Sequence, residues 1–234
     1  MGFQKIKSDS LTDKFIEQIE GMILSGELAT GEKLPSSRSL CEMMGISRPV
    51  VSAGIGKLES MGFVEVKPRQ GTFVSDYRRK GSVETLDAIM RYNGCLMRRE
   101  EVESLFQVRW ALDELAVRLV IERAKDAEIT SLRTYLEQAL EAATAEEEAQ
   151  AVFLFYHELT VISQNMIMPL VYHSFKSASE FLWERYIGLT HVGQLAEDVR
   201  GVMDALEARD EGSALEAVRS NWRKGMELLD EIAQ

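Results

Sequence analysis

The hydrophobic periodicity changes along this chain of 234 residues, and that change restricts the possible fold more than any other feature. Alternating apolar residues, the pattern of a half-buried strand, form two short runs, Phe63 to Lys67 and Gly71 to Ser75. From Ser82 to Gln234, apolar residues recur at helical spacing instead. We therefore expect a mainly α fold, in which an N-terminal part with one β-hairpin precedes a C-terminal all-α bundle of about seven helices.

Three helices are expected before the hairpin. Apolar residues at helical spacing run from Leu11 to Gly26, Ser36 or Ser37 can begin a second helix that ends at Gly45, and Ser47 begins a third that ends near Met61. A short turn with glycine joins the second and third helices, as in a helix-turn-helix, whose second helix places its first residues in the DNA major groove. Pro68-Arg-Gln-Gly71 then closes the hairpin as a wing. The segment is predicted to be a winged helix-turn-helix.

The charges support a division into two domains. Lys and Arg number 27 and Asp and Glu 38, so the net charge is −11, yet residues 1–75 contain nine basic and nine acidic residues. A neutral module attached to an acidic one can still offer one cationic face to phosphates. The basic run and glycine in Ser75 to Ser82 mark the boundary. We predict a DNA-binding domain over 1–75, a linker over 76–82 and a helical domain over 83–234.

Several function classes are not expected. The longest apolar stretches fall short of the ~20 residues of a membrane span, and no apolar run follows the first lysines, so we expect a cytoplasmic protein without membrane contact. Cys41 and Cys95 are too few for a disulfide framework. Three histidines, without a nucleophile motif, a phosphate-binding loop or paired His and Asp, make a DNA-tethered enzyme the weakest alternative, and no cofactor is expected.

In sequence, residues 9–75 resemble the winged-helix domain of the GntR family of bacterial transcription regulators. The similar motifs are Leu-Pro-Ser-Ser-Arg38 before the second helix, Ile-Ser-Arg48 before the third, and Pro-Arg-Gln-Gly-Thr-Phe-Val74 in the wing. The resemblance places the DNA contacts at Arg38, Ser47, Arg48, Arg69, Gln70 and Gly71, and Lys67 at the end of a wing strand is expected to bind phosphate. Guanidinium groups suit guanine edges and phosphates, a helix N-terminus suits a phosphate, and Gly71 would permit close backbone approach.

The third helix departs from that family in one respect. Ser52 stands where family members usually have a second arginine, and Ala53, Gly54 and Gly56 follow it. We include Ser52 among the predicted DNA-binding residues. The helix nevertheless has few base-reading side chains and poor helix propensity, so an atypical operator is expected.

Residues 82–232 resemble the helical effector domain of the FadR branch of the same family. The expected helices cover 82–93, 99–124, 127–143, 146–163, 167–188, 192–209 and 213–232. Many members of the branch hold a divalent metal through one Asp and three His, next to a small carboxylate ligand. Alignment to that pattern puts Val152, Tyr156, Val199 and Asn221 at the four ligand positions. Valines cannot bind a cation and a phenol with an amide suits one poorly, so no metal site is expected.

In lacking a metal site, the chain resembles the member that gives the branch its name, which binds long-chain acyl-CoA. We therefore expect a metal-independent amphipathic anion as effector, with acyl-CoA as an example, bound by Arg109, Tyr156, Tyr186 and Asn221. The leading prediction is a ligand-responsive regulator that acts as a homodimer on a palindromic double-stranded DNA operator. Two alternatives remain: an architectural DNA-binding dimer without a small-molecule effector, and a regulator of small organic acid metabolism.

Overall fold

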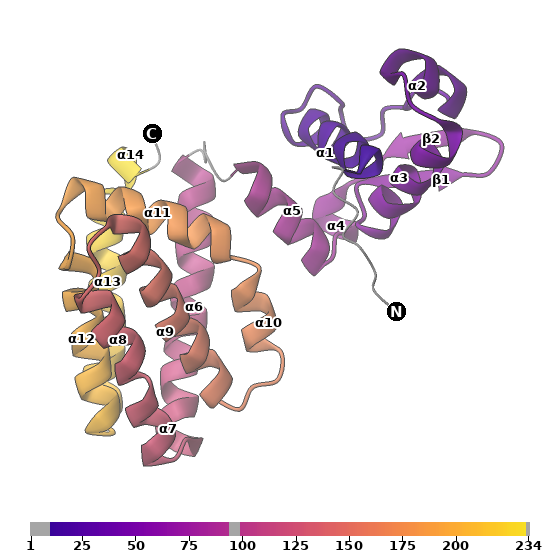
Figure 1. Ribbon diagram of the computed structural model, residues 1–234. Helices are drawn as coiled ribbons and strands as arrows, with labels where there is room; N and C mark the ends of the chain where they lie inside the picture. Colours follow the sequence, from indigo (N-terminus) through magenta and orange to yellow (C-terminus); the bar gives the residue numbers. More distant parts are fainter. Residues whose placement is uncertain (1–9, 94–98, 233–234) are drawn as a thin grey trace, which may run out of the picture. The chain divides into compact units, whose positions relative to one another are not determined.

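Two compact units make up the chain, Met1–Tyr92 and Asn93–Gln234 (Figure 1). The computed structural model describes residues 10–93 and 99–232. Cys41 is a partly buried free thiol, whereas Cys95 lies outside the described residues. In the parts described, no helix has the length and apolar character to cross a membrane.

The first unit has the predicted order of three helices and a hairpin. Its elements are α1 (Leu11–Leu24), α2 (Ser37–Met44), α3 (Arg48–Ser60), β1 (Val64–Lys67), β2 (Gly71–Val74), α4 (Tyr77–Lys80) and α5 (Val83–Asn93). The antiparallel strands pair Val64 with Val74 at one end and Lys67 with Gly71 at the other. Because opposite residues share a face, Val64 and Val74 both point into the core, where each is nearly fully buried.

Local signals fix the ends of α2 and the start of α3. Ser36 Oγ accepts a hydrogen bond from the Ser39 amide at 3.1 Å, so the side chain caps the first turn of α2. Gly45 ends that helix in the left-handed region, with φ of 64°. Helix α3 begins after Ser47, and Pro49 occupies its first turn, where a proline is tolerated. Two helices thus follow each other across a short turn, as the sequence predicts.

Helices α1 and α3 approach each other closely at Gly54. This glycine is buried, and a Cβ atom added to it would lie 2.2 Å from Cδ1 of Phe15 on α1. Phe15 is only 1% exposed and belongs to the core of the first unit, together with Ile19, Val51 and Leu58. Gly54, which lowers the helix propensity of α3, therefore has a packing role.

The boundary between the units differs from the predicted linker at 76–82. Residues 77–80 form the short helix α4, and residues 83–92 of α5 belong to the first unit. Thr85 donates its hydroxyl to the carbonyl of Met61, and Ala88 is 2% exposed within the same core. These contacts between distant parts of the chain hold residues 83–92 in the first unit.

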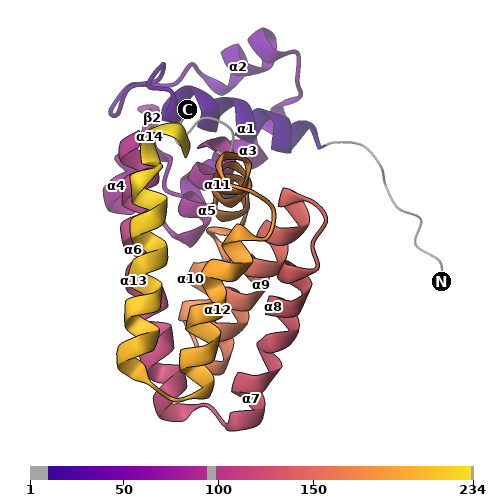
Figure 2. The ribbon, with the colours of Figure 1, turned by 90° about the vertical axis from the view of Figure 1, so that its left-hand side faces the viewer.

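The second unit is all helical within the residues described. Its elements are α6 (Arg99–Arg123), α7 (Asp126–Ser131), α8 (Arg133–Leu140), α9 (Ala145–Ile162), α10 (Met168–His173), α11 (Lys176–Leu189), α12 (Gln194–Glu207), α13 (Glu211–Glu227) and α14 (Leu229–Ile232). Helices α6, α8, α9, α12 and α13 run side by side, and α11 crosses one end of them. Helix α11 is seen from the side in Figure 1 and along its axis in Figure 2.

Three of the expected helices are each divided in two. The expected helix 127–143 breaks at Leu132, 167–188 breaks at Ser174 and Phe175, and 213–232 breaks at Leu228. At the first two breaks a serine hydroxyl competes for the backbone: Ser131 donates to the Glu128 carbonyl at 2.7 Å and Ser174 to the Val171 carbonyl at 2.6 Å. The bundle therefore has more and shorter helices than expected.

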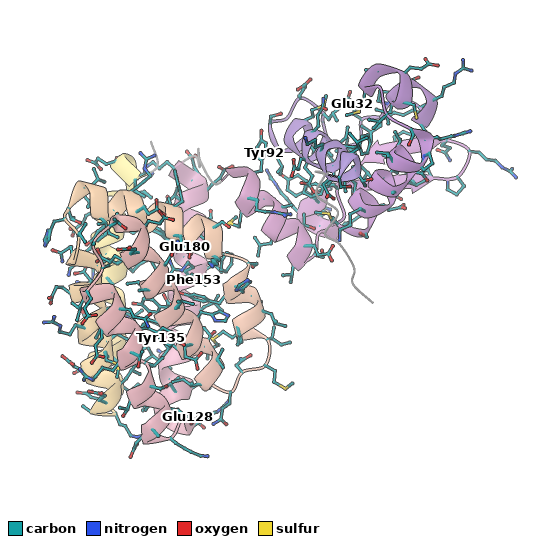
Figure 3. The ribbon with its side chains drawn as sticks, in the orientation of Figure 1. Glu32, Tyr92, Glu128, Tyr135, Phe153 and Glu180 are labelled. Carbon is teal, nitrogen blue, oxygen red and sulfur yellow. The ribbon has the colours of Figure 1, made fainter. Side chains whose placement is uncertain are left out.

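Buried polar and aromatic contacts fix α9 in this bundle. Glu148 is fully buried and accepts hydrogen bonds from the amides of Gly193 at 2.7 Å and Ala196 at 2.9 Å, which belong to the start of α12. One turn further, Phe153 lies inside the bundle (Figure 3), with its ring centroid 5.8 Å from that of Tyr172. The same helix is thereby held against α10 and α12, and it carries Tyr156 into the interior.

Candidate functional site

The residues predicted to bind DNA lie on three elements of the first unit, and all are exposed. Arg38 is the second residue of α2, and its Nε lies 3.0 Å from Oε1 of Glu42, an exposed pair that contributes little stability. Ser47 and Arg48 begin α3, and Ser52 follows Arg48 by four residues, so these last two share one face of the helix. The hydroxyl of Ser47 makes no capping bond, which leaves it available to a ligand.

The remaining predicted contacts gather on the turn of the hairpin. Lys67 ends β1, Gly71 begins β2, and Arg69 and Gln70 form the turn between them. Arg69 has φ of 62°, a left-handed conformation that is uncommon outside glycine. Ion pairs to Arg48, Lys67 or Arg69 are absent among the described residues. The first unit therefore presents unneutralised cations at a helix start and at a turn.

A cavity of about 80 Å³ lies inside the second unit, and all four predicted ligand-binding residues line it. Its walls come from α6, α9, α11, α12, α13 and α14: Phe106, Arg109, Trp110, Asp113, Tyr156, Trp183, Tyr186, Leu195, Asp198, Val199, Val218, Asn221, Trp222, Gly225 and Ile232. Since one water needs ~10–15 Å³ of such space, the cavity has room for more than one water-sized group, and it is partly open rather than closed.

Arg109 is the central charged group of the cavity. The side chain is 7% exposed, and its guanidinium carbon lies 4.2 Å from the ring centre of Trp183. Its Nη2 donates to the Tyr172 hydroxyl at 2.7 Å and lies 3.8 Å from Oδ2 of Asp113, one helical turn along α6. Burial raises the pKa of Asp113 to about 6, against the opposing effect of Arg109. The pair therefore changes its net charge near neutral pH.

Tyr186 and Asn221 line the cavity but already have partners. The hydroxyl of Tyr186 donates to Oδ2 of Asp198 at 2.7 Å, and Asn221 Nδ2 donates to the backbone carbonyl of Asp198 at 2.8 Å. Lys224 completes the group through an ion pair with Oδ1 of that aspartate. Of the four residues predicted from sequence, Arg109 is the one with a buried polar atom, Nε, that lacks a hydrogen-bond partner among the described residues.

Four buried polar atoms around the cavity lack a hydrogen-bond partner within the described part of the chain. They are three donors, Arg109 Nε, Trp110 Nε1 and Trp222 Nε1, and one acceptor, Asp113 Oδ1. The two indole rings stack with their centroids 4.9 Å apart. An unpaired buried polar group costs about 1–3 kcal/mol, so four of them around one cavity indicate a bound ligand or water that satisfies them.

The positions aligned with a metal site do not fit a divalent cation. Tyr156, Val199 and Asn221 line the cavity, whereas Val152 is not among its lining residues. Val152 and Val199 are at most 1% exposed and have no ligating atom. Burial raises the pKa of the Tyr156 phenol, which therefore stays neutral, and no cluster of three or more His, Cys, Asp or Glu exists within 10–93 and 99–232.

Sequence reasoning did not select Asp113, Asp198 or the tryptophan pair as site residues. Asp113 follows Arg109 by four residues on α6, a spacing that places both on one helix face and could have identified it. Asp198 precedes the aligned position Val199 and accepts a hydrogen bond from Gln194, four residues earlier on α12. Its other partners come from α11 and α13, and no local pattern reveals those.

Comparison with known proteins agrees with both units. Residues 11–74 match the model of the bacterial regulatory proteins of the gntR family, and residues 104–223 match the FCD domain. The chain is 30% identical over 218 residues to the HTH-type transcriptional regulator LutR of Bacillus subtilis, covering 89% of this chain and 96% of LutR. It is 29% identical over 224 residues to the HTH-type transcriptional regulator Mce2R of Mycobacterium tuberculosis, covering 94% of this chain and 91% of Mce2R.

A solved structure shares the fold. It is described as Lar, which controls the expression of the Listeria monocytogenes agr system and mediates virulence, and it aligns with a TM-score of 0.61 at 16% identity, covering 98% of both chains. At that identity the likeness concerns the fold alone.

Proposed function

The chain belongs to the GntR family in the branch with an FCD domain, as a DNA-binding transcription regulator with an effector domain, and we propose that it acts as a homodimer controlled by a small organic anion. The observation that supports this effector is the buried guanidinium of Arg109 in the wall of the cavity, where its Nε and the indole N–H groups of Trp110 and Trp222 lack partners among the described residues. A buried cation and N–H donors in the walls of one cavity suit a ligand rich in acceptors, such as a carboxylate.

The cavity favours a small acid over the acyl-CoA expected from the sequence. An acyl-CoA has dozens of heavy atoms, whereas only about 80 Å³ of this partly open cavity admits the centre of a water molecule. The larger molecule would have to extend beyond the cavity or move apart the helices that line it. The small-acid alternative needs no such rearrangement, and Arg109 can replace the charge that a metal supplies elsewhere in the branch.

A homodimer on a palindromic operator completes the proposal. One winged-helix unit with a single arginine at the start of α3 offers few base contacts, and two half-sites on one DNA molecule multiply its affinity. Native mass spectrometry gives the subunit number, and selection from random duplexes gives the operator. An inverted repeat bound by a dimer is expected. A monomer that selects a single half-site would contradict this part.

The chain provides its own probe for the effector, because all three of its tryptophans line the cavity. We propose to titrate the protein with acetate, propionate, glycolate and medium-chain acyl-CoA while following tryptophan emission. A small acid should change the emission and the affinity for the selected duplex, and Arg109→Leu should abolish both effects. Acyl-CoA binding without any small-acid response would contradict the proposed effector. Unchanged DNA affinity with every ligand that binds would favour the architectural alternative.

A further inference from the structure

A third segment joins the edge of the wing, and it brings a lysine that the DNA-binding motifs do not include. Lys33 forms an antiparallel bridge with Phe73 of β2. On either side, the Val74 amide donates to the Glu32 carbonyl at 2.8 Å and the Leu34 amide donates to the Thr72 carbonyl at 2.9 Å. Figure 3 labels Glu32, the residue before Lys33. Because this segment runs antiparallel to β2, it leads towards the turn that carries Arg69 and Gln70.

The side chain of Lys33 extends along the wing to that turn. Residues paired across strands share a face, so Lys33, Phe73, Lys67 and Gly71 lie on the face opposite the buried valines of the hairpin. A Cβ atom built on Gly71 would lie 2.7 Å from Cε of Lys33 and 3.5 Å from its Nζ. The last methylene group of the Lys33 stem therefore occupies the space that a side chain at position 71 would take, and the ammonium group lies next to it.

An aromatic ring lies between two ammonium groups of this face. Nζ of Lys67 is 4.9 Å from the ring centre of Phe73, and Nζ of Lys33 is 6.0 Å from it. Such cation–π contacts hold flexible lysine stems in place without neutralising their charge. The ring thus organises two cations beside the arginine of the turn.

The charges of this face are left for a partner outside the unit. Glu65 is the carboxylate on the same face, and it pairs with Lys80, whose Nζ lies 2.7 Å from Oε2; Lys67 has a smaller electrostatic effect on it. Neither Lys33 nor Lys67 forms an ion pair with any residue that the structure describes. Three unneutralised cations at one turn repel each other, and a polyanion with closely spaced charges relieves that repulsion.

We propose that Lys33 binds a DNA phosphate as the third cation of the wing, and that Gly71 is its positioning residue. This rests on the proposed DNA-binding function of the first unit. It adds to the role expected for Gly71: besides permitting close approach of the backbone to DNA, the missing side chain makes room for Lys33. Gly71 also has φ of 120°, which disfavours any other residue there.

The test measures affinity by fluorescence anisotropy at several salt concentrations, with a selected duplex and an unrelated duplex. Lys33→Met keeps the length of the stem and removes the charge. It should lower the affinity for both duplexes about three- to tenfold. It should also lower the magnitude of the slope of log K against log salt by about 0.9, the value for one released counterion. Lys33→Arg should restore the slope. The matched control is Lys57→Met, since Lys57 is paired with Glu84 and lies near the end of α3; it should match wild type.

Gly71→Ala tests the positioning role. It should lower the salt slope as Lys33→Met does. The double variant Lys33→Met/Gly71→Ala should bind DNA no more weakly than Gly71→Ala alone. Melting curves should confirm that these variants fold. Two losses that simply multiply would refute the link between the residues. Wild-type affinity and slope for Lys33→Met, with Arg48→Ala still weakening binding, would refute the phosphate contact. If wild type binds neither duplex, the DNA-binding function itself fails.

Discussion

Two glycines of α3, Gly54 and Gly56, provide a sharp test of the packing in the first unit. They lie two residues apart in one helix, so both pay the same intrinsic penalty of ~0.5–1 kcal/mol relative to alanine. Gly56 faces open space, whereas a Cβ on Gly54 would lie 2.2 Å from Cδ1 and 2.7 Å from Cε1 of Phe15. The same substitution should therefore have opposite effects at the two positions.

The magnitudes follow from the surroundings. Gly56→Ala should raise the free energy of unfolding by ~0.5–1 kcal/mol, because it gains helix propensity and meets no atom. Gly54→Ala gains the same propensity but must displace a ring that is 1% exposed, and overpacking of this kind costs ~1–3 kcal/mol. Gly54→Ala should thus be about 1–3 kcal/mol less stable than Gly56→Ala, since the propensity difference cancels between them.

The assay has to follow the first unit itself. All three tryptophans lie in the second unit, so their emission does not report on α3. Amide hydrogen exchange of α1 and α3 measures local opening and compares the two variants directly. Adding Phe15→Leu to Gly54→Ala should recover part of the loss, because the smaller side chain makes room. Equal protection in the two alanine variants, or greater protection in Gly54→Ala, would refute the close approach of α1 to α3.

Three further predictions concern DNA, metal and pH. Arg48→Ala should cost about 1–3 kcal/mol of operator affinity and relax the base preference, whereas Lys67→Ala should lower the affinity for all duplexes by the same factor. Equal losses from both variants, independent of sequence, in a titration of operator variants would contradict the assignment of Arg48 to bases and Lys67 to phosphate. Because Val152 and Val199 occupy two aligned ligand positions, elemental analysis of tag-free protein should find no stoichiometric transition metal. This prediction would be wrong if the protein contained stoichiometric zinc, nickel or manganese and if a chelator that removes the metal lowered the melting temperature. Burial raises the pKa of Asp113 to about 6, so above that pH its carboxylate is charged and repels an anionic effector. Calorimetry with small acids should therefore show the tightest binding below pH 6 and weaker binding towards pH 8. An affinity that does not change with pH would contradict the role of this residue.

Local signals made the first unit predictable. Ser36 and Gly45 delimit α2 through bonds and backbone angles within a few residues, and the alternating runs around Pro68 to Gly71 contain the hairpin in full. The end of the unit was not predictable in this way. It depends on Thr85 and Ala88 meeting a core formed more than twenty residues earlier, and no pattern within α5 reveals that contact.

The cavity shows the same division between local and distant determinants. Arg109, Tyr156, Tyr186 and Asn221 converge on it, as the family resemblance led us to expect. Sequence could not show that Tyr186 and Asn221 are already bound to Asp198, because those bonds join three separate helices. Nor could it give the volume of the cavity, which depends on how all the helices pack and on which we base the proposal of a small acid as effector.

The short helix α14 has a practical consequence for anyone who handles this protein. It follows a break at Leu228, its Ile232 is 1% exposed and forms part of the cavity wall, and Asp230 and the Glu231 carbonyl bind Arg99 and Arg185. A purification tag, fluorescent protein or surface-capture linker joined after Gln234 would begin two residues from the wall of this cavity. If the cavity binds the proposed effector, such a fusion should change the ligand response, so it should be compared with the untagged chain.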